Sequence, residues 1–143
     1  MITSKLLKSS SVLWVIWGIV HVFFGVLIIY GDAASGIQAI ANGLELPMLN
    51  YSEAADAVIN QHGWNLIWFG VVTTIGGVLV WKKNDTAIWV SAMVGGFADL
   101  GYFIFLDLGG YVKFFPGTLM TIIALIAIIL SFTARYKIKN LTA

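Results

Sequence analysis

Four long apolar runs, separated by polar stretches, dominate the sequence. Each run has about 20 mostly apolar residues, the length that an α-helix needs to cross the hydrocarbon core of a bilayer. The runs cover residues 12–30, 63–81, 86–106 and 116–134. The pattern therefore predicts an all-α integral membrane protein in which one domain, residues 1–143, forms a four-transmembrane-helix bundle.

The segment between the first two runs, residues 31–62, is too long for a simple turn. Apolar residues recur at helical spacing after Ser52, and Asn50 precedes Glu53 by the three residues of a capping-box-like helix start. We expect a short helix at residues 33–41 and another from about Ser52 that could continue into the second span. The outer loop is therefore predicted to be a partly helical cap.

Local signals mark the edges of the spans. Asn84 or Asp85 can cap the third helix, and Pro116 suits the first turn of the fourth. Tryptophans are typical of membrane–water interfaces. Four of them fall near predicted span ends, namely Trp14, Trp64, Trp81 and Trp89. After Thr118 and Thr121 the fourth span is nearly continuous isoleucine, leucine and alanine, so we expect it to face lipid most.

The composition supports a membrane protein and limits the chemistry. Apolar residues make up 59% of the chain and charged residues 10%, whereas roughly a quarter of the residues of a soluble domain are charged. There is no cysteine, which excludes disulfides, thiolate metal sites, iron–sulfur clusters and cysteine nucleophiles.

The basic residues indicate an orientation. If the chain crosses the membrane four times, only one basic residue, Lys113, falls on one side of it. The others fall on the opposite side, namely Lys5, Lys8, Lys82, Lys83, Arg135, Lys137 and Lys139. The positive-inside rule then places both termini in the cytoplasm. Loops that follow the positive-inside rule and the lack of cysteine favour a prokaryotic plasma (inner) membrane. Size and layout resemble in outline the DoxX-like group of small bacterial membrane proteins, whose motifs are absent, so no residue role follows.

Two ionisable side chains lie deep inside the predicted spans. At about 1.5 Å per residue, His21 and Asp99 lie roughly 14 and 20 Å from the cytoplasmic ends of their spans. The offset is about one helical turn, so the two side chains could pair, with Tyr102 hydrogen-bonding either one. Such residues are costly in a membrane and often functional. Three interpretations remain open: a functional midplane site, a structural pair that fixes helix register, and contacts with a partner protein.

Further polar and aromatic residues cluster near the outer ends of the spans. We predict an outer rim above the midplane site, made of His62, Asp107, Asp32, Trp64 and Asn65. Small residues allow membrane helices to approach closely. The predicted helix-packing positions are Gly18, Gly25, Gly70, Gly77 and Gly95.

The function that these features favour is small-molecule binding or proton relay at a buried His/Asp site. One alternative is a non-catalytic accessory subunit of a larger membrane complex, and a second is an intramembrane acid–base enzyme acting on a lipid-like substrate. A non-enzymatic role is favoured, and no catalytic residue is assigned. His21 and His62 differ in depth by about 15 Å, so no shared haem or metal site is predicted and the cofactor stays unknown. Expected partners are the bilayer, other membrane subunits or a second copy, and a small apolar or amphipathic ligand, but not nucleic acid.

Overall fold

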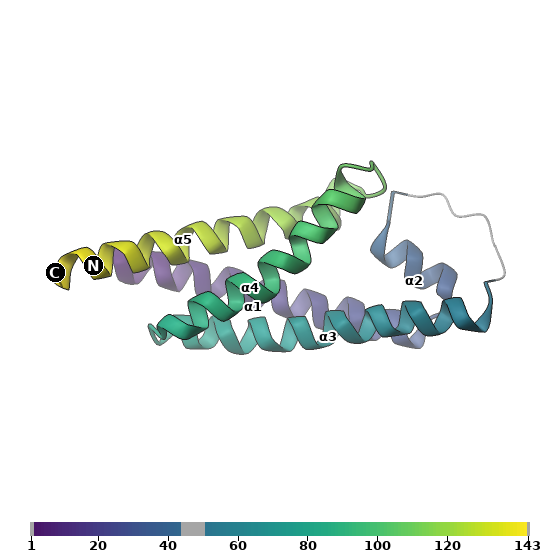
Figure 1. The fold of residues 1–143 in the computed structure, drawn as a ribbon, viewed down its shortest axis with the longest axis horizontal. Coiled ribbons are helices and arrows are strands. Elements are labelled where there is room, and N and C mark those ends of the chain that lie inside the picture. The colour runs from purple at the N-terminus through teal and green to yellow at the C-terminus, as the bar shows by residue number, and fades with distance from the viewer. Residues whose placement is uncertain (1, 44–50, 143) are drawn as a thin grey trace.

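The structure is a computed structural model that describes residues 2–43 and 51–142, and every regular element in this part of the chain is helical (Figure 1). The helices are α1 (Ile2–Tyr30), α2 (Ala33–Ile40), α3 (Glu53–Trp81), α4 (Asp85–Tyr102) and α5 (Leu119–Thr142). Two π-helical turns, η1 (Phe103–Asp107) and η2 (Phe114–Thr118), extend α4 and precede α5.

Within residues 2–43 and 51–142, four segments are long and apolar enough to cross a membrane. They are Thr3–Tyr30, Glu53–Trp81, Asp85–Asp107 and Phe114–Ile138. The prediction of four apolar membrane-length helices is therefore confirmed. The last segment has the smallest buried share of the four, in line with the expectation for the fourth span.

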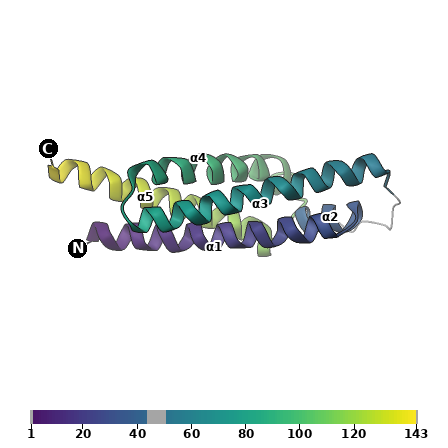
Figure 2. The same ribbon diagram turned by 90° about the horizontal axis from the view of Figure 1, so that it is seen from below.

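The helices form an elongated bundle with both chain termini at the same end (Figures 1 and 2). We call this the terminal end, and we call the opposite end, where α2 and the turns η1 and η2 lie, the α2 end. The most extensive helix contact joins α1 to α3, and α5 packs on α1 as well. Helix α4 crosses the bundle obliquely in Figure 1 and contacts α3 and α5.

The outer segment is partly helical, as predicted. Asp32 caps α2, and its carboxylate accepts a hydrogen bond from the Ser35 backbone N–H at 2.8 Å. The second outer helix is continuous with the second span and starts at Glu53, with Ser52 as its N-cap. Asn50, the predicted capping residue, lies outside the described residues, and the helix takes its cap from the Ser52 hydroxyl instead. The Ser52 hydroxyl oxygen accepts a hydrogen bond from the Ala55 backbone N–H at 3.3 Å, as an N-cap side chain does.

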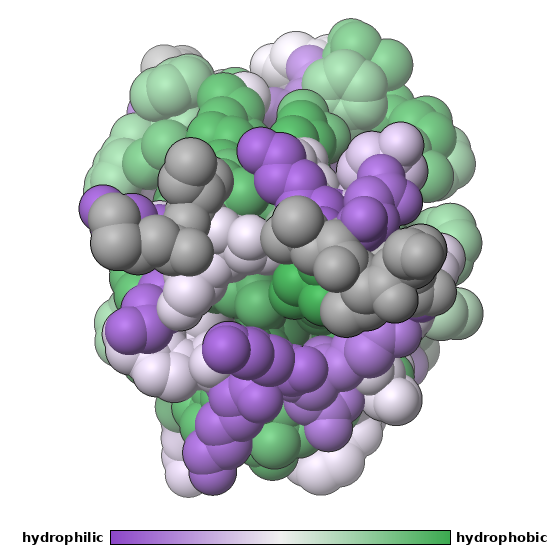
Figure 3. Space-filling view, turned by 90° about the vertical axis from the view of Figure 1, so that its left-hand side faces the viewer, coloured by the Kyte–Doolittle hydropathy of each residue, from purple (hydrophilic) through white to green (hydrophobic). Residues whose placement is uncertain are grey.

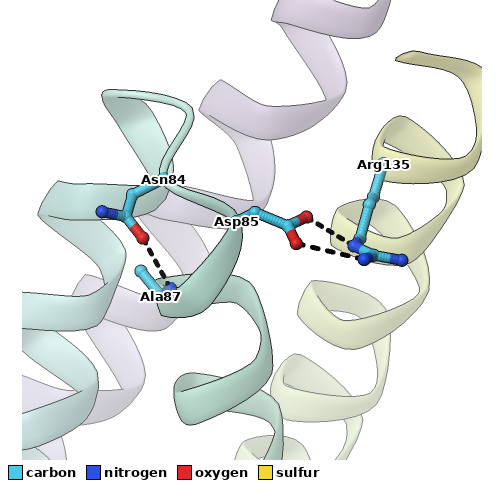
Figure 4. A network of polar contacts seen from close by, with 4 residues as sticks. All are labelled: Asn84, Asp85, Ala87 and Arg135. Carbon is cyan, nitrogen blue, oxygen red and sulfur yellow. Dashed lines mark hydrogen bonds and ion pairs between the residues drawn. The ribbon is translucent and has the colours of Figure 1, made fainter. Parts of the chain in front are cut away.

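The start of α4 is fixed by two neighbouring residues with different partners (Figure 4). Asn84 is the N-cap, and its side-chain oxygen accepts a hydrogen bond from the Ala87 N–H at 2.9 Å. The next residue, Asp85, forms an ion pair and two hydrogen bonds with Arg135 of α5. The α3–α4 turn is therefore held against α5 at the terminal end.

The terminal end of the bundle has its own apolar cluster. Leu7 of α1 is 2% exposed, which explains why α1 continues as a helix well before the predicted apolar run. It packs with Val80, Ala87, Ile88 and Ala134. Nearby, the Ser11 hydroxyl donates to the Gly77 carbonyl at 2.6 Å, one of the interhelical hydrogen bonds that polar residues make in membrane bundles.

Two tryptophans of α1 form the centre of the bundle. Trp14 and Trp17 are both fully buried and meet edge to face, with ring centroids 6.2 Å apart. The prediction that Trp14 belongs to an interfacial belt was wrong. Its ring lies against α4 at Gly95, where an added Cβ would come within 2.5 Å of it, so the missing side chain on α4 makes room for the indole.

Candidate functional site

A cavity of about 70 Å³ lies in the half of the bundle nearer the α2 end. All five helices and the turn η2 contribute to its wall. The lining residues are Val20, His21, Phe24, Ala39, Ile40, Asn42, His62, Leu66, Asp99, Tyr102, Pro116, Gly117 and Met120. Most of this wall is apolar, and the two ionisable groups predicted at the midplane, His21 and Asp99, both line it.

Trp17 connects the two ionisable residues. Its indole N–H donates to Asp99 Oδ2 at 2.8 Å. The His21 ring stacks on the same indole, with centroids 3.5 Å apart and an interplanar angle of 21°. The predicted direct pair between His21 and Asp99 is not formed, because the flat indole lies in contact with both residues and supplies the donor that the carboxyl group needs.

The tautomer of His21 follows from its hydrogen bond. Its Nδ1 lies 2.8 Å from the Trp17 carbonyl oxygen, and because a carbonyl only accepts, Nδ1 carries the proton and donates. A neutral His21 then has Nε2 available as an acceptor. Asp99 is 6% exposed, and its Oδ1 has no hydrogen-bond partner in the described chain. The cavity therefore presents two hydrogen-bond acceptors in an otherwise apolar wall.

Tyr102 lines the cavity but bonds to neither predicted partner. Its hydroxyl donates to the Ile40 carbonyl oxygen at 3.1 Å, so the prediction that it supports His21 or Asp99 was wrong. Ile40 is the last residue of α2, and the carbonyls of a last helical turn lack partners within the helix. The tyrosine satisfies one of them and ties α4 to α2.

Asn42 is a site residue that the sequence analysis missed. Its side-chain oxygen accepts from the Lys113 N–H at 2.6 Å, and its amide donates to the Phe115 carbonyl at 3.3 Å. The adjacent Gly43 N–H donates to the Tyr111 carbonyl at 2.9 Å. Together these bonds hold the end of α2 on the loop before α5, across the α2 end of the cavity. The Asn-Gly pair is a turn signal, but nothing in it indicates which loop it binds.

The predicted outer rim is only partly assembled. His62 is half-buried and lines the cavity. Asp107 lies in η1 and accepts hydrogen bonds from the hydroxyls of Thr118 and Thr121. These bonds join the end of α4 to the start of α5, so Asp107 lies beside the cavity wall without being part of it.

The other three rim residues lie away from the cavity. Asp32 caps α2 at the surface, where hydrogen bonds from the side chain and backbone of Ser35 lower its pKa below the ordinary value. Trp64 is 59% exposed. Asn65 accepts a hydrogen bond from the Trp68 indole at 3.2 Å. These groups face outward along α3 and at the start of α2.

The five predicted packing glycines all lie where helices meet. A Cβ on Gly18 would come within 2.5 Å of the Gly70 carbonyl oxygen, and one on Gly70 within 2.4 Å of the Gly18 oxygen. Gly25 faces Gly63 in the same way, at 2.5 Å. Gly77 abuts Ser11, and Gly95 abuts Trp14. The α1–α3 contact is therefore close enough for backbones to touch.

In the described part of the chain, no three histidine, aspartate or glutamate side chains lie close enough together to hold a metal ion. The residues that line the cavity offer apolar contact and hydrogen bonding. No protein-family model matches the chain, and no curated protein or solved structure is detectably similar to it.

Proposed function

We propose that the chain is a multi-pass protein of a prokaryotic plasma membrane with both termini in the cytoplasm. Hydrophilic side chains gather on the terminal end (Figure 3). The described part of that end carries Lys5, Lys8, Lys82, Lys83, Arg135 and Lys137, whereas the loop at the α2 end carries Lys113. This asymmetry supports the positive-inside orientation. Because the chain has no cysteine, Lys137→Cys and Lys113→Cys test it in intact cells. An impermeant maleimide is expected to label only the second variant, and labelling of only the first would reverse the topology.

We propose further that the cavity binds a small amphipathic molecule that carries a hydrogen-bond donor, such as a hydroxyl, amide or amine. The observation that carries this proposal is the free acceptor Asp99 Oδ1 beside His21 in a mostly apolar cavity. A carboxyl oxygen that faces a mostly apolar cavity without a donor is poorly solvated, which costs free energy. A ligand donor would remove that cost, and the apolar wall would accept the rest of the molecule.

The volume limits what the cavity accepts. A water needs roughly 10–15 Å³ in such a measure, so about 70 Å³ suits a few waters or a polar group of a few atoms. Pockets for whole drug-sized ligands are larger, at roughly 300–1,000 Å³. The proposed ligand therefore places a small head beside Asp99 and extends its apolar part toward the α2 end.

The tryptophans favour binding over proton relay. Trp14 and Trp17 are fully buried on the terminal side of Asp99, together with Ala124 and Ala127. Buried hydroxyls lie further toward the terminal end, at Ser10, Ser91 and Ser131, but a relay would have to cross the two indoles to reach them. A cavity that ends on two indoles is better suited to holding a ligand than to passing protons across the membrane.

A high-resolution density map of protein extracted gently from its membrane tests the binding proposal. We expect non-protein density within hydrogen-bonding distance of Asp99 Oδ1 and His21 Nε2, and its loss in Asp99→Leu. A hydrogen bond contributes roughly 0.5–1.5 kcal/mol net, so the variant should bind about two- to tenfold more weakly. Asp107→Asn is the matched control, because Asp107 lies outside the cavity wall. A closed, dry contact between His21 and Asp99 in the map would refute the proposal.

An accessory subunit is the second candidate, and one observation favours it. Several apolar side chains at the α2 end are strongly exposed, among them Phe105 at 74%, Phe115 at 71% and Leu108 at 68%. A partner subunit could cover them. Mild-detergent extraction followed by size analysis separates the two proposals, since a subunit should leave the membrane in a larger complex. The enzyme alternative draws no support from a cavity of this size, because an elongated lipid-like substrate needs more room.

A further inference from the structure

A second hollow lies on the outside of the bundle, between α1 and α3 near the terminal end. It is a groove of about 370 Å³. Val12, Val15 and Ile16 of α1 form one wall, and Val78 and Trp81 of α3 form the other. Val12, Val78 and Trp81 are each 47% exposed. The groove is therefore an open apolar channel on the surface that would face lipid.

The end of the groove nearest the chain termini is cationic. Lys82 lines the groove at the last turn of α3. The Lys8 ammonium lies 5.0 Å from the centre of the Trp81 ring, a cation–π distance, and Lys8 precedes Val12 by one helical turn. No acidic residue lines the groove. The one acidic residue of the adjoining turn, Asp85, forms an ion pair with Arg135 on the α5 side.

Lys83, which follows Lys82 in the chain, adds a third positive charge at a conformational cost. Lys83 has φ = 63°, in the left-handed region, just after the last turn of α3. Glycine or asparagine usually occupies this position because other side chains are strained there. Lys83 does not line the groove, but it adds a positive charge to the turn that follows Lys82.

We propose that this groove binds an anionic phospholipid of the leaflet at the terminal end. One acyl chain lies along the valines and Ile16, and the phosphate group meets the ammonium groups of Lys8 and Lys82. The apolar walls match a hydrocarbon chain, and the uniform positive charge at the mouth matches an anionic headgroup. The site is separate from the His21–Asp99 cavity and depends only on the membrane insertion proposed above.

Native mass spectrometry of the purified protein with added phosphatidylglycerol or phosphatidylcholine tests the proposal. The two lipids carry similar chains but differ in net charge. Each lysine near a headgroup is expected to favour the anionic lipid about fivefold, so the Lys8→Gln/Lys82→Gln variant should lose about 25-fold in preference. The control Lys5→Gln/Lys137→Gln removes the same charge from exposed residues at the same end, outside the groove. It should keep the preference.

A second variant tests the apolar part while leaving the charges intact. Val12→Trp fills the groove at an exposed position where folding tolerates a large side chain, and it should displace both lipids. Equal binding of the two lipids by the unmodified protein, an equal loss in the control, or full binding by Val12→Trp would each overturn the proposal. Dimer masses without bound phospholipid would overturn it in favour of a second copy of the chain.

Discussion

The close contact of α1 and α3 leads to a sharp prediction for Gly18→Ala. A Cβ at this position would lie 2.3 Å from Thr74 Oγ1, 2.5 Å from the Gly70 carbonyl oxygen and 2.8 Å from the Thr74 nitrogen. The threonine side chain can rotate away. The two backbone atoms cannot move unless the helices separate.

The size of the effect follows from these distances. Ordinary contact with a Cβ begins at 3.4 Å, so the helices must separate by roughly 0.9 Å at the crossing. A gap of this size forfeits a quarter to a half of each dispersion contact along the interface. Overpacking of this kind costs about 1–3 kcal/mol, and we expect Gly18→Ala to lower the free energy of unfolding by that amount.

Gly101→Ala is the matched control, because it makes the same chemical change in α4 where nothing lies within 4 Å of the new Cβ. It should be neutral or stabilising by up to about 1 kcal/mol, since alanine favours helix more than glycine. The assay is unfolding of the purified protein in mixed micelles with increasing dodecyl sulfate, followed by circular dichroism. Stabilities of the two variants within about 0.5 kcal/mol of each other would refute the backbone-contact argument.

Two further predictions concern the Trp17–Asp99 hydrogen bond beside the cavity and the N-terminal cap of α2. Trp17→Phe removes the hydrogen bond to Asp99 and should cost about 1–3 kcal/mol more than Trp14→Phe, because the Trp14 indole N–H has no partner in the described chain; equal losses in the same unfolding assay would argue against the bond. The lowered pKa of Asp32 means that its cap stabilises α2 above the ordinary pKa of 3.8 and loses this effect as the pH falls through the lower folded value. After correction for the pH dependence of intrinsic amide exchange, the protection of the α2 amides should therefore fall below about pH 3.8. Asp32→Asn, which keeps a capping oxygen, should show no such step, and an identical step in both would contradict the assignment.

The helices were predictable because their signals are local. An apolar run of about 20 residues and a capping side chain depend on neighbouring positions only, so the spans and the Asn84 cap follow from the sequence. The exact cap of α3 was harder, since Asn50 and Ser52 both offer a suitable oxygen within two residues. The helix begins next to the serine, and a periodicity argument does not separate two such neighbours.

The site was less predictable, because it depends on how each helix is rotated about its axis. Helical rise gives the depth of a residue, and on that basis His21 and Asp99 were expected at similar levels; both line one cavity. Glycines mark where the helices pack closely, but the remaining faces of each span are apolar all round, so the sequence does not mark which of them turns toward the cavity. The position of Trp17 between the two groups depends on this rotation, and so does the reach of Tyr102 to Ile40.

The two ends of the cavity are held in different ways, which makes the end at Trp17 and Asp99 rigid and the α2 end less so. On one side, glycines hold α1 against α3 at backbone contact, which fixes the helix carrying Trp17 and His21. At the α2 end, α2 is held by four hydrogen bonds of Asn42, Gly43 and Tyr102 and by a fifth from the Ala33 N–H to Asp56. At about 0.5–1.5 kcal/mol each, their sum is a few kcal/mol, and α2 packs on its neighbours far less extensively than α1 packs on α3. If the proposed binding holds, a ligand too large for the closed cavity would enter by displacing α2, while Trp17 and Asp99 at the other end of the cavity stay in place.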